Sequence, residues 1–418
     1  MFKRGLRYAA LFSLSATASF LYSSVKDADS PMYPHVFMPI LQRLDAEDAH
    51  NLSKLMLKWG LGPVDKTLLK KNVNSLTPPP MVNLNTQVLG QYFENPIGLA
   101  AGFDKDSECM EAIENLGFGF MEVGSVCPKP QEGNPKPRIF RVKSKVSDVD
   151  EQVFDTIINR CGFNSKGIEV TEEHLKAYRE KRKNTNSSFH VGVNLGKNKT
   201  SPPESIEDYL TGVKRLAKYA DFMVINVSSP NTQHLRSLQE KDSLDGLLEQ
   251  VSVELRKESS RRIPLLVKIA PDLTLDQQRD IANLVLKHKI DGIIVSNTTV
   301  ERPFVSQSQL DSIPNSNMGG LSGRPLFPKS TKVLRNMYKL TDGKVTLIGV
   351  GGVWDGYDAL QKIEAGASLV QVYTAFTAQG PQVVGRIKRE LSQLLKERGY
   401  KGVSDAVGAK AKFAKLEE

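Results

Sequence analysis

Cysteine is scarce in this chain of 418 residues, which contains only Cys109, Cys127 and Cys161. They form no CxxC pair and cannot build a disulfide framework, which is typical of a reducing compartment. The six histidines show neither an HExxH motif nor another paired spacing. We therefore predict no metal site.

Blocks of charge of one sign are also missing. The net charge of +9 comes from 56 lysines and arginines against 47 acids, and the basic residues are scattered without interleaved aromatics. This pattern argues against nucleic-acid binding, although a basic balance also suits an anionic membrane or ligand. The hydrophobic content of 40% and charged content of 25% are those of an ordinary globular protein.

No acidic residue precedes Asp27, and the leader carries Lys3, Arg4 and Arg7. The uncharged residues 8–25 could just span a bilayer at about 1.5 Å per residue, although they are rich in serine. A cleaved secretory signal and a removed mitochondrial presequence are alternatives. We favour a retained single-pass anchor after a short basic leader, and assign residues 1–29 to this segment.

Residues 30–76 have the pattern of two short helices, over 32–44 and 46–60, with Asp45 as the N-cap of the second. Their apolar side chains exceed what two helices can bury against each other. They must face the main domain, a membrane or an apolar ligand, and packing on the main domain explains most of them. The sequence SLTPPP then marks a linker.

Short apolar runs alternate with helical patterns from about residue 90 onward. This alternation predicts a parallel sheet that is buried on both faces. Eight such units match the count and size of a (β/α)8 TIM barrel. A doubly wound open sheet is the competing fold, but no GxGxxG motif follows the first predicted strand of this sequence. The predicted strands lie in 96–102, 118–126, 189–196, 221–228, 264–270, 291–297, 344–352 and 367–373.

Three predicted connections, 127–188, 229–242 and 298–328, are long, and loops of that length usually carry function. Polar or glycine residues also follow every predicted strand, at the end where barrel enzymes place their chemistry. In strand order these are Ala100, Ala101, Gly102 and Lys105; Ser125; Asn194; Asn226, Ser229 and Asn231; Lys268; Asn297 and Thr298; Gly351 and Gly352; and Tyr373 and Thr374.

This set contains no pair of acids for glycoside hydrolysis and no histidine-based nucleophile. Amides read the donor and acceptor edges of a flat heterocycle, and the ends of strands seven and eight commonly bind phosphate. A heterocycle with a phosphate tail suggests flavin mononucleotide (FMN). Lys268 could place a positive charge beside its ring.

The residues resemble the dihydroorotate dehydrogenase family, in its membrane-associated, quinone-dependent mitochondrial branch. The resemblance runs from about residue 33 to 395 and implies an FMN barrel over 77–400, followed by a polar tail over 401–418. Its segments are GLAAGFDK (98–105), EVGSVCPKPQEGNPKPRIFR (122–141), NRCGFNSKG (159–167), VNLGKNK (193–199), NVSSPNT (226–232), NTT (297–299), GGLSGRPL (319–326), GVGGV (349–353) and YTAF (373–376).

The resemblance implies a role for each matched residue. Ser229 would be the catalytic base, where the soluble branches have cysteine, and Lys105 would be the second catalytic residue, holding the substrate carboxylate. The FMN contacts would be Ala101, Gly102, Phe103, Asp104, Lys105, Ser125, Asn194, Asn226, Lys268, Ser296, Gly323, Gly352, Tyr373 and Thr374. Dihydroorotate, the precursor of orotate, would contact Lys105, Asn159, Arg160, Cys161, Gly162, Phe163, Asn226, Asn231, Asn297 and Thr298.

Two features depart from the family pattern: Cys161 replaces an aromatic residue, and the connection between residues 141 and 159 is long. The resemblance further implies that the two amino-terminal helices form an apolar tunnel for ubiquinone. By the same resemblance, the protein would be located at the mitochondrial inner membrane, with the barrel in the intermembrane space. The tunnel residues would be Gln42, His50, Arg141 and Tyr373.

Two rival functions remain open from the residues alone. A tRNA dihydrouridine synthase would explain the positive charge but predicts a cysteine acid and an RNA-binding domain. A non-catalytic membrane scaffold predicts loss of Lys105, Ser229 or Lys268, and all three are present. The glycosylation sequon at Asn226 falls inside the predicted pocket, where a glycan could not be accommodated.

Overall fold

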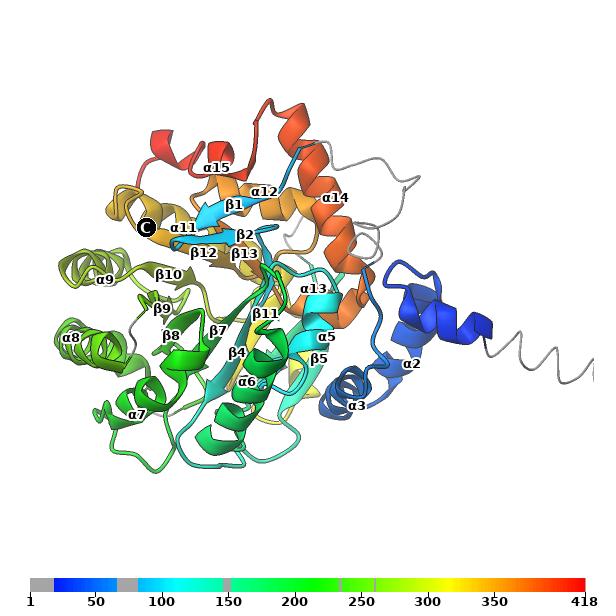
Figure 1. The fold of residues 1–418 in the computed structure, drawn as a ribbon, viewed down its shortest axis with the longest axis horizontal. Helices are drawn as coiled ribbons and strands as arrows, with labels where there is room; N and C mark the ends of the chain where they lie inside the picture. Colours follow the sequence, from blue (N-terminus) through cyan, green and yellow to red (C-terminus); the bar gives the residue numbers. More distant parts are fainter. Residues whose placement is uncertain (1–18, 66–81, 146–151, 233–234, 259–260, 418) are drawn as a thin grey trace, which may run out of the picture.

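The computed structural model describes residues 19–65, 82–145, 152–232, 235–258 and 261–417. Eight parallel strands close into a barrel in the order β10-β12-β13-β3-β4-β7-β8-β9, which confirms the predicted TIM barrel (Figure 1). All eight predicted apolar runs contribute one strand each. The strands are β3 (Ile97–Leu99), β4 (Phe120–Val126), β7 (His190–Leu195), β8 (Phe222–Asn226), β9 (Leu265–Ile269), β10 (Gly292–Val295), β12 (Thr346–Val350) and β13 (Leu369–Val372).

Helices surround the barrel and bury the apolar side chains between themselves and the strands (Figure 1). They are α5 (Met110–Asn115), α6 (Ile168–Arg182), α7 (Glu207–Leu216), α8 (Lys241–Glu258), α9 (Leu275–Lys287), α11 (Phe327–Leu340), α12 (Gly356–Glu364) and α14 (Gln382–Glu397), with shorter α10 (Gln307–Asp311) and α13 (Thr374–Gln379). The helix α9 begins with a capping box, in which Thr274 and Gln277 satisfy each other's backbone N–H groups.

The barrel interior changes from apolar to polar along its axis. Its amino-terminal end is closed by the hairpin of β1 (Thr86–Val88) and β2 (Gln91–Phe93), whose Phe93 packs edge-on against Phe120 at 5.8 Å. A Cβ on Gly98 would lie 2.4 Å from the Phe120 ring, so glycine is required for this close packing. Glu122 lies two residues further along β4 than Phe120 and faces the barrel interior as well, because alternate residues of a strand share one face. A carboxylate therefore follows the aromatic ring along the barrel axis.

Part of the first long connection forms a small sheet of its own. The hairpin β5 (Ile139–Ser144) and β6 (Phe154–Asn159) is joined by β11 (Gly320–Gly323) from the third long connection. Because β11 pairs with β6 in antiparallel register, residues 161 to 167 positions apart in the chain lie next to each other above the barrel. The sequence predicts long functional connections here but no sheet.

The amino-terminal unit lies on one side of the barrel (Figure 1). It consists of η1 (Tyr33–Phe37), α2 (Met38–Arg43) and α3 (Ala46–Lys58), and the Asp45 side chain accepts hydrogen bonds from the backbone N–H of Glu47 and Asp48. The predicted N-cap is therefore confirmed. The buried pair of Glu47 with Arg138, 2.7 Å apart, ties α3 to the connection that leads into β5.

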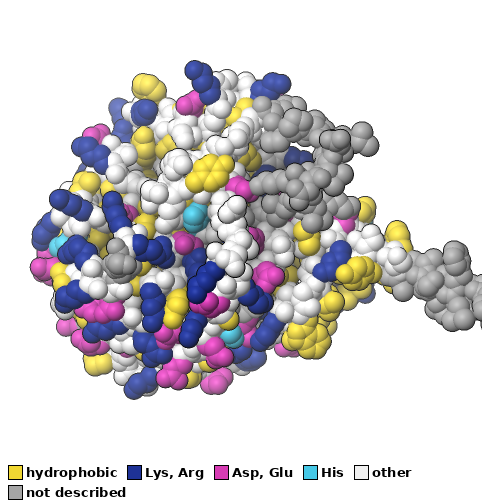
Figure 2. All heavy atoms as spheres, viewed as in Figure 1, with side chains coloured by type: hydrophobic (Ala, Val, Ile, Leu, Met, Phe, Trp, Pro, Cys, Tyr) yellow, Lys and Arg dark blue, Asp and Glu magenta, His cyan; other side chains and the backbone are white. Residues whose placement is uncertain are grey.

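Apolar side chains gather on the outer face of this unit (Figure 2), which lies beside the described start of the chain. The exposed residues are Ile40, Leu44, Leu52, Leu55, Met56, Trp59 and Leu61. In the part of the chain that the structure describes, no helix is long and apolar enough to cross a bilayer. Most of the predicted anchor, residues 8–18, lies outside the described residues.

The described part of the last segment, residues 401–417, packs partly against the barrel, whereas its composition predicts a polar tail over 401–418. It contains α15 (Val403–Ala406) and η6 (Ala411–Phe413), and it buries Val403, Ala406 and Ala411. The Asn336 side chain on α11 donates a hydrogen bond to the carbonyl of Glu417 at 2.7 Å.

Candidate functional site

A cavity of about 1070 Å³ opens at the carboxyl ends of the barrel strands. Residues from the ends of seven barrel strands reach it: Ala100, Ser125, Asn226, Lys268, Ser296, Val350 and Val372. The small β5-β6-β11 sheet contributes Ile139, Ile157, Asn159, Ser322 and Gly323. The cavity is large enough for a cofactor together with a small substrate.

Side-chain amides form one connected network at the barrel mouth. Asn226 donates to the Ser125 hydroxyl at 2.9 Å and to the Asn194 amide oxygen at 3.3 Å. Its own amide oxygen accepts from Ser228 and, at 3.4 Å, from Asn297. Each amide is held by its neighbours, so the free donors and acceptors keep fixed directions toward the cavity.

Glu122 anchors the network from below and is completely buried. Its carboxylate accepts from Lys268 at 3.1 Å, from Gln371 at 2.9 Å and from the Asn194 amide. A buried carboxylate must be paired and hydrogen-bonded in this way, because its desolvation is otherwise costly. The carboxylate therefore fixes the Lys268 ammonium at the floor of the cavity.

Two further contacts cross from the barrel to the small sheet and its loops. Lys105 Nζ donates to the Asn164 amide oxygen, and Asn231 Nδ2 donates to the Asn159 amide oxygen at 2.9 Å. Asn134 supports both loops, because it donates to the carbonyls of Arg160 and Asn231. A ligand in the cavity would thus be enclosed between the strand ends and the segment 159–164.

The structure brings most of the predicted site residues together in the cavity lining. They are Ala101, Gly102, Lys105, Ser125, Asn159, Cys161, Gly162, Phe163, Asn226, Ser229, Asn231, Lys268, Ser296, Asn297, Thr298, Gly323, Gly352, Tyr373 and Thr374. The Ser229 side chain is 6% exposed, and its hydroxyl accepts from the Asn231 backbone N–H at 3.3 Å.

Four other predicted residues do not reach the lining. Asn194 is buried beneath Asn226, and the Asp104 carboxylate accepts from the backbone N–H groups of Glu108 and Cys109. Phe103 packs against Phe376. The Arg160 guanidinium turns away and donates to the Pro314 and Pro137 carbonyls, so its side chain holds the loop and is not directed into the cavity.

A second cavity, of about 320 Å³, lies between the amino-terminal unit and the barrel. Its lining is mainly apolar, with Tyr33, Phe37, Ala49, Met56, Phe376 and neighbouring residues. All four predicted tunnel residues, Gln42, His50, Arg141 and Tyr373, line it as well. Arg141 is directed to the carbonyl groups of Leu44 and Gln42, at 2.7 Å and 3.3 Å.

The two cavities share one wall. Four residues line both of them: His50, Ile139, Ile157 and Tyr373. Burial, with a smaller contribution from Lys105 and Lys54, lowers the pKa of His50 to about 3, so its ring is neutral near pH 7. Burial raises the pKa of Tyr373, which therefore keeps its phenolic proton. The wall is thus uncharged and thin, with aromatic groups at the junction.

Sequence reasoning missed several residues that support the site. Glu122 carries a recognisable signal, because it is the one acid within an otherwise apolar predicted strand. Asn164, Gln371, Arg236 and Asp272 carry no such signal, since each becomes relevant only through a partner that is distant in the chain.

Comparisons with known proteins agree with this geometry. Residues 83–395 match the sequence model of the family described as dihydroorotate dehydrogenase. The chain is 48% identical over 383 residues to "Dihydroorotate dehydrogenase (quinone), mitochondrial" of Mus musculus, covering 91% of each. It is 47% identical to the protein of that name from Oryza sativa subsp. japonica, covering 89% of this chain and 78% of that one.

Solved structures give the same result. Ligand-free DHODH from Eimeria tenella has a TM-score of 0.76 and 41% identity, over 88% of this chain and 99% of that chain. The same enzyme in complex with ferulenol has a TM-score of 0.76 and 40% identity, over 88% and 96% of the two chains. The family model covers the barrel, and the relatives and solved structures cover 88–91% of the chain, and from these matches we conclude that this chain belongs to the dihydroorotate dehydrogenase family.

Proposed function

We propose that this protein oxidises dihydroorotate to orotate in pyrimidine biosynthesis, with FMN in the large cavity and ubiquinone as the final electron acceptor. The observation that carries the proposal is the pair of cavities with one shared wall at His50 and Tyr373. One cavity is lined by amides and suits a polar heterocycle, and the other is apolar and suits a quinone. Electrons need only cross the wall between them.

The large cavity contains unsatisfied groups that fit a flavin and its substrate. Among the described residues, the amide oxygens of Gln371 and Asn231 are buried without a hydrogen-bond partner. Such atoms are rare in native proteins and call for a ligand donor. Flavin and dihydropyrimidine rings both carry N–H groups that can supply it, and the surrounding amides match their alternating donors and acceptors.

The proposed FMN contacts divide by chemistry. Asn226, Ser125 and Lys268 would hold the ring from the strand ends, with Asn194 supporting Asn226 from beneath, while Gly323, Gly352 and Thr374 would hold the phosphate. Gly323 and Gly352 have positive φ values of 118° and 79°, which bring their backbone close to the cavity. FMN bound there would supply the hydride acceptor for the substrate and the two electrons for the quinone. Lys268 places a fixed positive charge beneath the site.

Substrate oxidation removes a proton from C5 and a hydride from C6 of dihydroorotate, so one group of the protein must accept the proton. We assign this role to Ser229, which lines the cavity. A serine hydroxyl is a weak base and must pass its own proton onward.

The remaining polar groups would orient the substrate. Lys105 supplies a positive charge for the carboxylate, and Asn159, Asn231, Asn297 and Thr298 supply donors and acceptors for the ring amides. Cys161 and Phe163 enclose it from the loop above. A ring held by several fixed contacts reacts faster, because its orientation is set before the chemical step.

The quinone would enter through the amino-terminal unit, whose outer face is apolar (Figure 2). We therefore propose residues 1–29 as leader and membrane anchor, 30–76 as the quinone-tunnel unit, 77–400 as the FMN barrel and 401–418 as a terminal segment. The site would lie at the mitochondrial inner membrane, with the barrel on the intermembrane-space side. An apolar face beside the anchor would let a lipid-soluble quinone reach the second cavity directly.

The absorption spectrum of the purified protein tests this function. We expect a flavin band in the visible region that bleaches when dihydroorotate is added without oxygen, and returns when decylubiquinone is added. A colourless protein that takes up no FMN on reconstitution would refute the cofactor assignment. A flavin that dihydroorotate leaves oxidised would refute the substrate assignment.

A further inference from the structure

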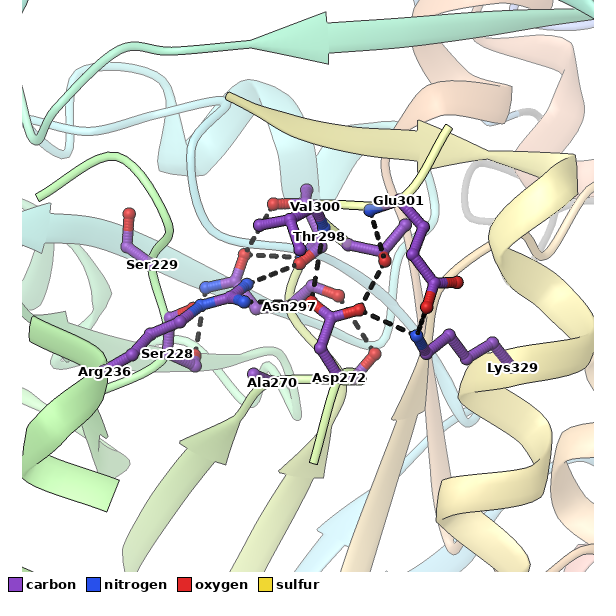
Figure 3. Close-up of polar contacts among 12 residues, drawn as sticks. Ser228, Ser229, Arg236, Ala270, Asp272, Asn297, Thr298, Val300, Glu301 and Lys329 are labelled. Carbon is purple, nitrogen blue, oxygen red and sulfur yellow. Dashed lines mark hydrogen bonds and ion pairs between the residues drawn. The ribbon is translucent and has the colours of Figure 1, made fainter. Parts of the chain in front are cut away.

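Arg236 makes three contacts behind the catalytic loop (Figure 3). It lies in η4 (Leu235–Gln239), after the end of β8. Its Nε donates to the Ser228 carbonyl at 3.0 Å, Nη2 donates to the Thr298 carbonyl at 3.1 Å, and Nη1 donates to the Asp272 carboxylate at 2.9 Å. One planar side chain therefore joins the loops that follow β8, β9 and β10.

The two carbonyl groups belong to residues next to the proposed chemistry. The Ser228 carbonyl is part of the peptide that leads into Ser229, and Thr298 follows Asn297. Arg236 thus contacts the backbone beside the proposed base, rather than its hydroxyl. Ser229, Asn297 and Thr298 line the large cavity, so the guanidinium group fixes two of its walls relative to each other.

Asp272 is itself firmly anchored. Its Oδ1 accepts from the Thr299 hydroxyl at 2.5 Å and lies 2.9 Å from Lys329 Nζ on α11, while Oδ2 accepts from the Val300 N–H at 3.2 Å (Figure 3). Burial opposes ionisation, but the Thr299 hydroxyl, Lys329 and Arg236 outweigh it and hold the pKa of Asp272 below its ordinary value. The carboxylate is therefore charged near pH 7 and gives Arg236 a fixed partner.

The geometry of this contact requires a guanidinium group. A fork of coplanar N–H donors can reach two carbonyls and a carboxylate in fixed directions, whereas a lysine ammonium is a point charge on a flexible stem. A small rotation of the 228–229 peptide would change the direction of the Ser229 hydroxyl. Displacements of about 1 Å at a reacting group can reduce a rate by about 100-fold.

We propose that Arg236 is a positioning residue for dihydroorotate oxidation: held by Asp272, it locks the Ser228–Ser229 backbone against the loop 297–299 and so fixes the direction of the proton-accepting hydroxyl. This inference rests on the proposed function of the large cavity and on the proposed role of Ser229. It adds a residue outside the cavity lining to the machinery of the reductive half-reaction, in which the substrate reduces the flavin.

The test compares Arg236→Lys with the wild-type protein in anaerobic stopped-flow experiments. We expect the limiting rate constant for flavin reduction by dihydroorotate to fall by about 10- to 100-fold. The dissociation constant of dihydroorotate, obtained from the same concentration series, should change by less than about threefold. FMN content and the rate of reoxidation by decylubiquinone should stay at their wild-type values, because Arg236 is not part of the lining of either cavity.

Arg179 provides a matched control in the same chain. Its Nε donates to the Tyr219 carbonyl at 2.8 Å and its Nη2 to the Asp221 carboxylate at 2.7 Å. The side chains of this pair are 25% and 15% exposed, against 25% and 14% for Arg236 and Asp272. Asp221 lies just before β8, at the opposite end of the barrel, so Arg179→Lys should match the stability loss of Arg236→Lys without slowing flavin reduction.

Each outcome separates the inference from the proposed function. If dihydroorotate fails to reduce the wild-type flavin, the proposed function fails. If it reduces wild type and Arg236→Lys at equal rates, only the inference fails. It also fails if Arg236→Lys merely loses FMN or stability while its FMN-loaded fraction reacts normally. Should Arg236→Lys not fold, Asp272→Asn must slow flavin reduction in the same selective way, and normal reduction by that variant overturns the inference.

Discussion

The ion pair of Glu122 and Lys268 beneath the large cavity leads to a quantitative prediction for stability. The Lys268 ammonium lies 3.1 Å and 3.3 Å from the two carboxylate oxygens, and the two side chains are 7% and 0% exposed. Gln371 and Asn194 donate to the same carboxylate. Replacing Glu122 with glutamine keeps the shape of the side chain but removes its charge and one acceptor.

The expected loss in the free energy of unfolding follows from the Lys268 ammonium that Glu122→Gln leaves buried without a charged partner. Breaking a buried ion pair from one side costs about 3–5 kcal/mol, because the other charge remains buried without a partner. Replacing Lys268 with methionine in the Glu122→Gln background removes that charge, so the double variant should be no less stable than Glu122→Gln alone. The sum of the two single losses should therefore exceed the loss of the double variant by at least about 3 kcal/mol, which is the coupling free energy of the pair.

The measurement is equilibrium urea unfolding of the FMN-free protein, followed by circular dichroism. Asp276→Asn serves as the control, because the Arg279–Asp276 pair is exposed and should contribute less than about 1 kcal/mol. If the losses of the two single variants add to that of the double variant within about 0.5 kcal/mol, the two charges do not stabilise each other and the reasoning is refuted.

Three further predictions concern activity and pH. Ser229→Ala should slow flavin reduction by dihydroorotate by about 100-fold or more at neutral pH, since general base catalysis contributes about 10²–10⁴-fold, and should leave FMN binding intact. Ser53→Phe should raise the KM for decylubiquinone and spare flavin reduction, because Ser53 lines the 320 Å³ cavity and a phenyl ring would fill part of it. His50 takes up a proton in the unfolded chain near pH 6.5 but in the folded protein only near pH 3. The contribution of His50 to the free energy of unfolding is therefore fully present above pH 6.5 and falls by about 1.4 kcal/mol per pH unit between pH 6.5 and 3. The substitution His50→Asn should remove this pH dependence, measured by urea unfolding.

Each of these predictions has a result that would contradict it. Unchanged flavin reduction in Ser229→Ala would assign the proton transfer to another group. A normal KM for quinone in Ser53→Phe would place the quinone outside the second cavity. An unaltered pH slope in His50→Asn would mean that His50 does not titrate as its burial requires.

Much of the fold could be predicted from local patterns. Eight apolar runs with helices between them identify the barrel strands, because a strand buried on both faces is apolar along most of its length. Asp45 could be recognised as a cap from its position before a helical pattern, since its carboxylate needs only the N–H groups of the next turn. Such features depend only on residues that are close in the chain, so they can be predicted without the tertiary structure.

The same holds for part of the site. Every predicted strand end carries polar or glycine residues, and parallel strands in a barrel bring those ends to one rim. Most of the predicted ligand residues accordingly line the large cavity. Residues such as Arg160 and Asp104 belong to the same motifs but turn away, because a motif gives the path of the backbone and not the direction of each side chain.

The tertiary structure decided the pairings on which the chemistry depends. Glu122 meets Lys268 across 146 residues, and Arg236 meets Asp272 across 36, because barrel closure and strand register bring them together. The wall shared by the two cavities likewise joins a helix, a hairpin and the end of the last strand. The sequence by itself determined which residues are polar and where each strand ends. Only the closed barrel determined their partners, since the alternation of side chains along a strand selects a face but not the residue that it will contact there.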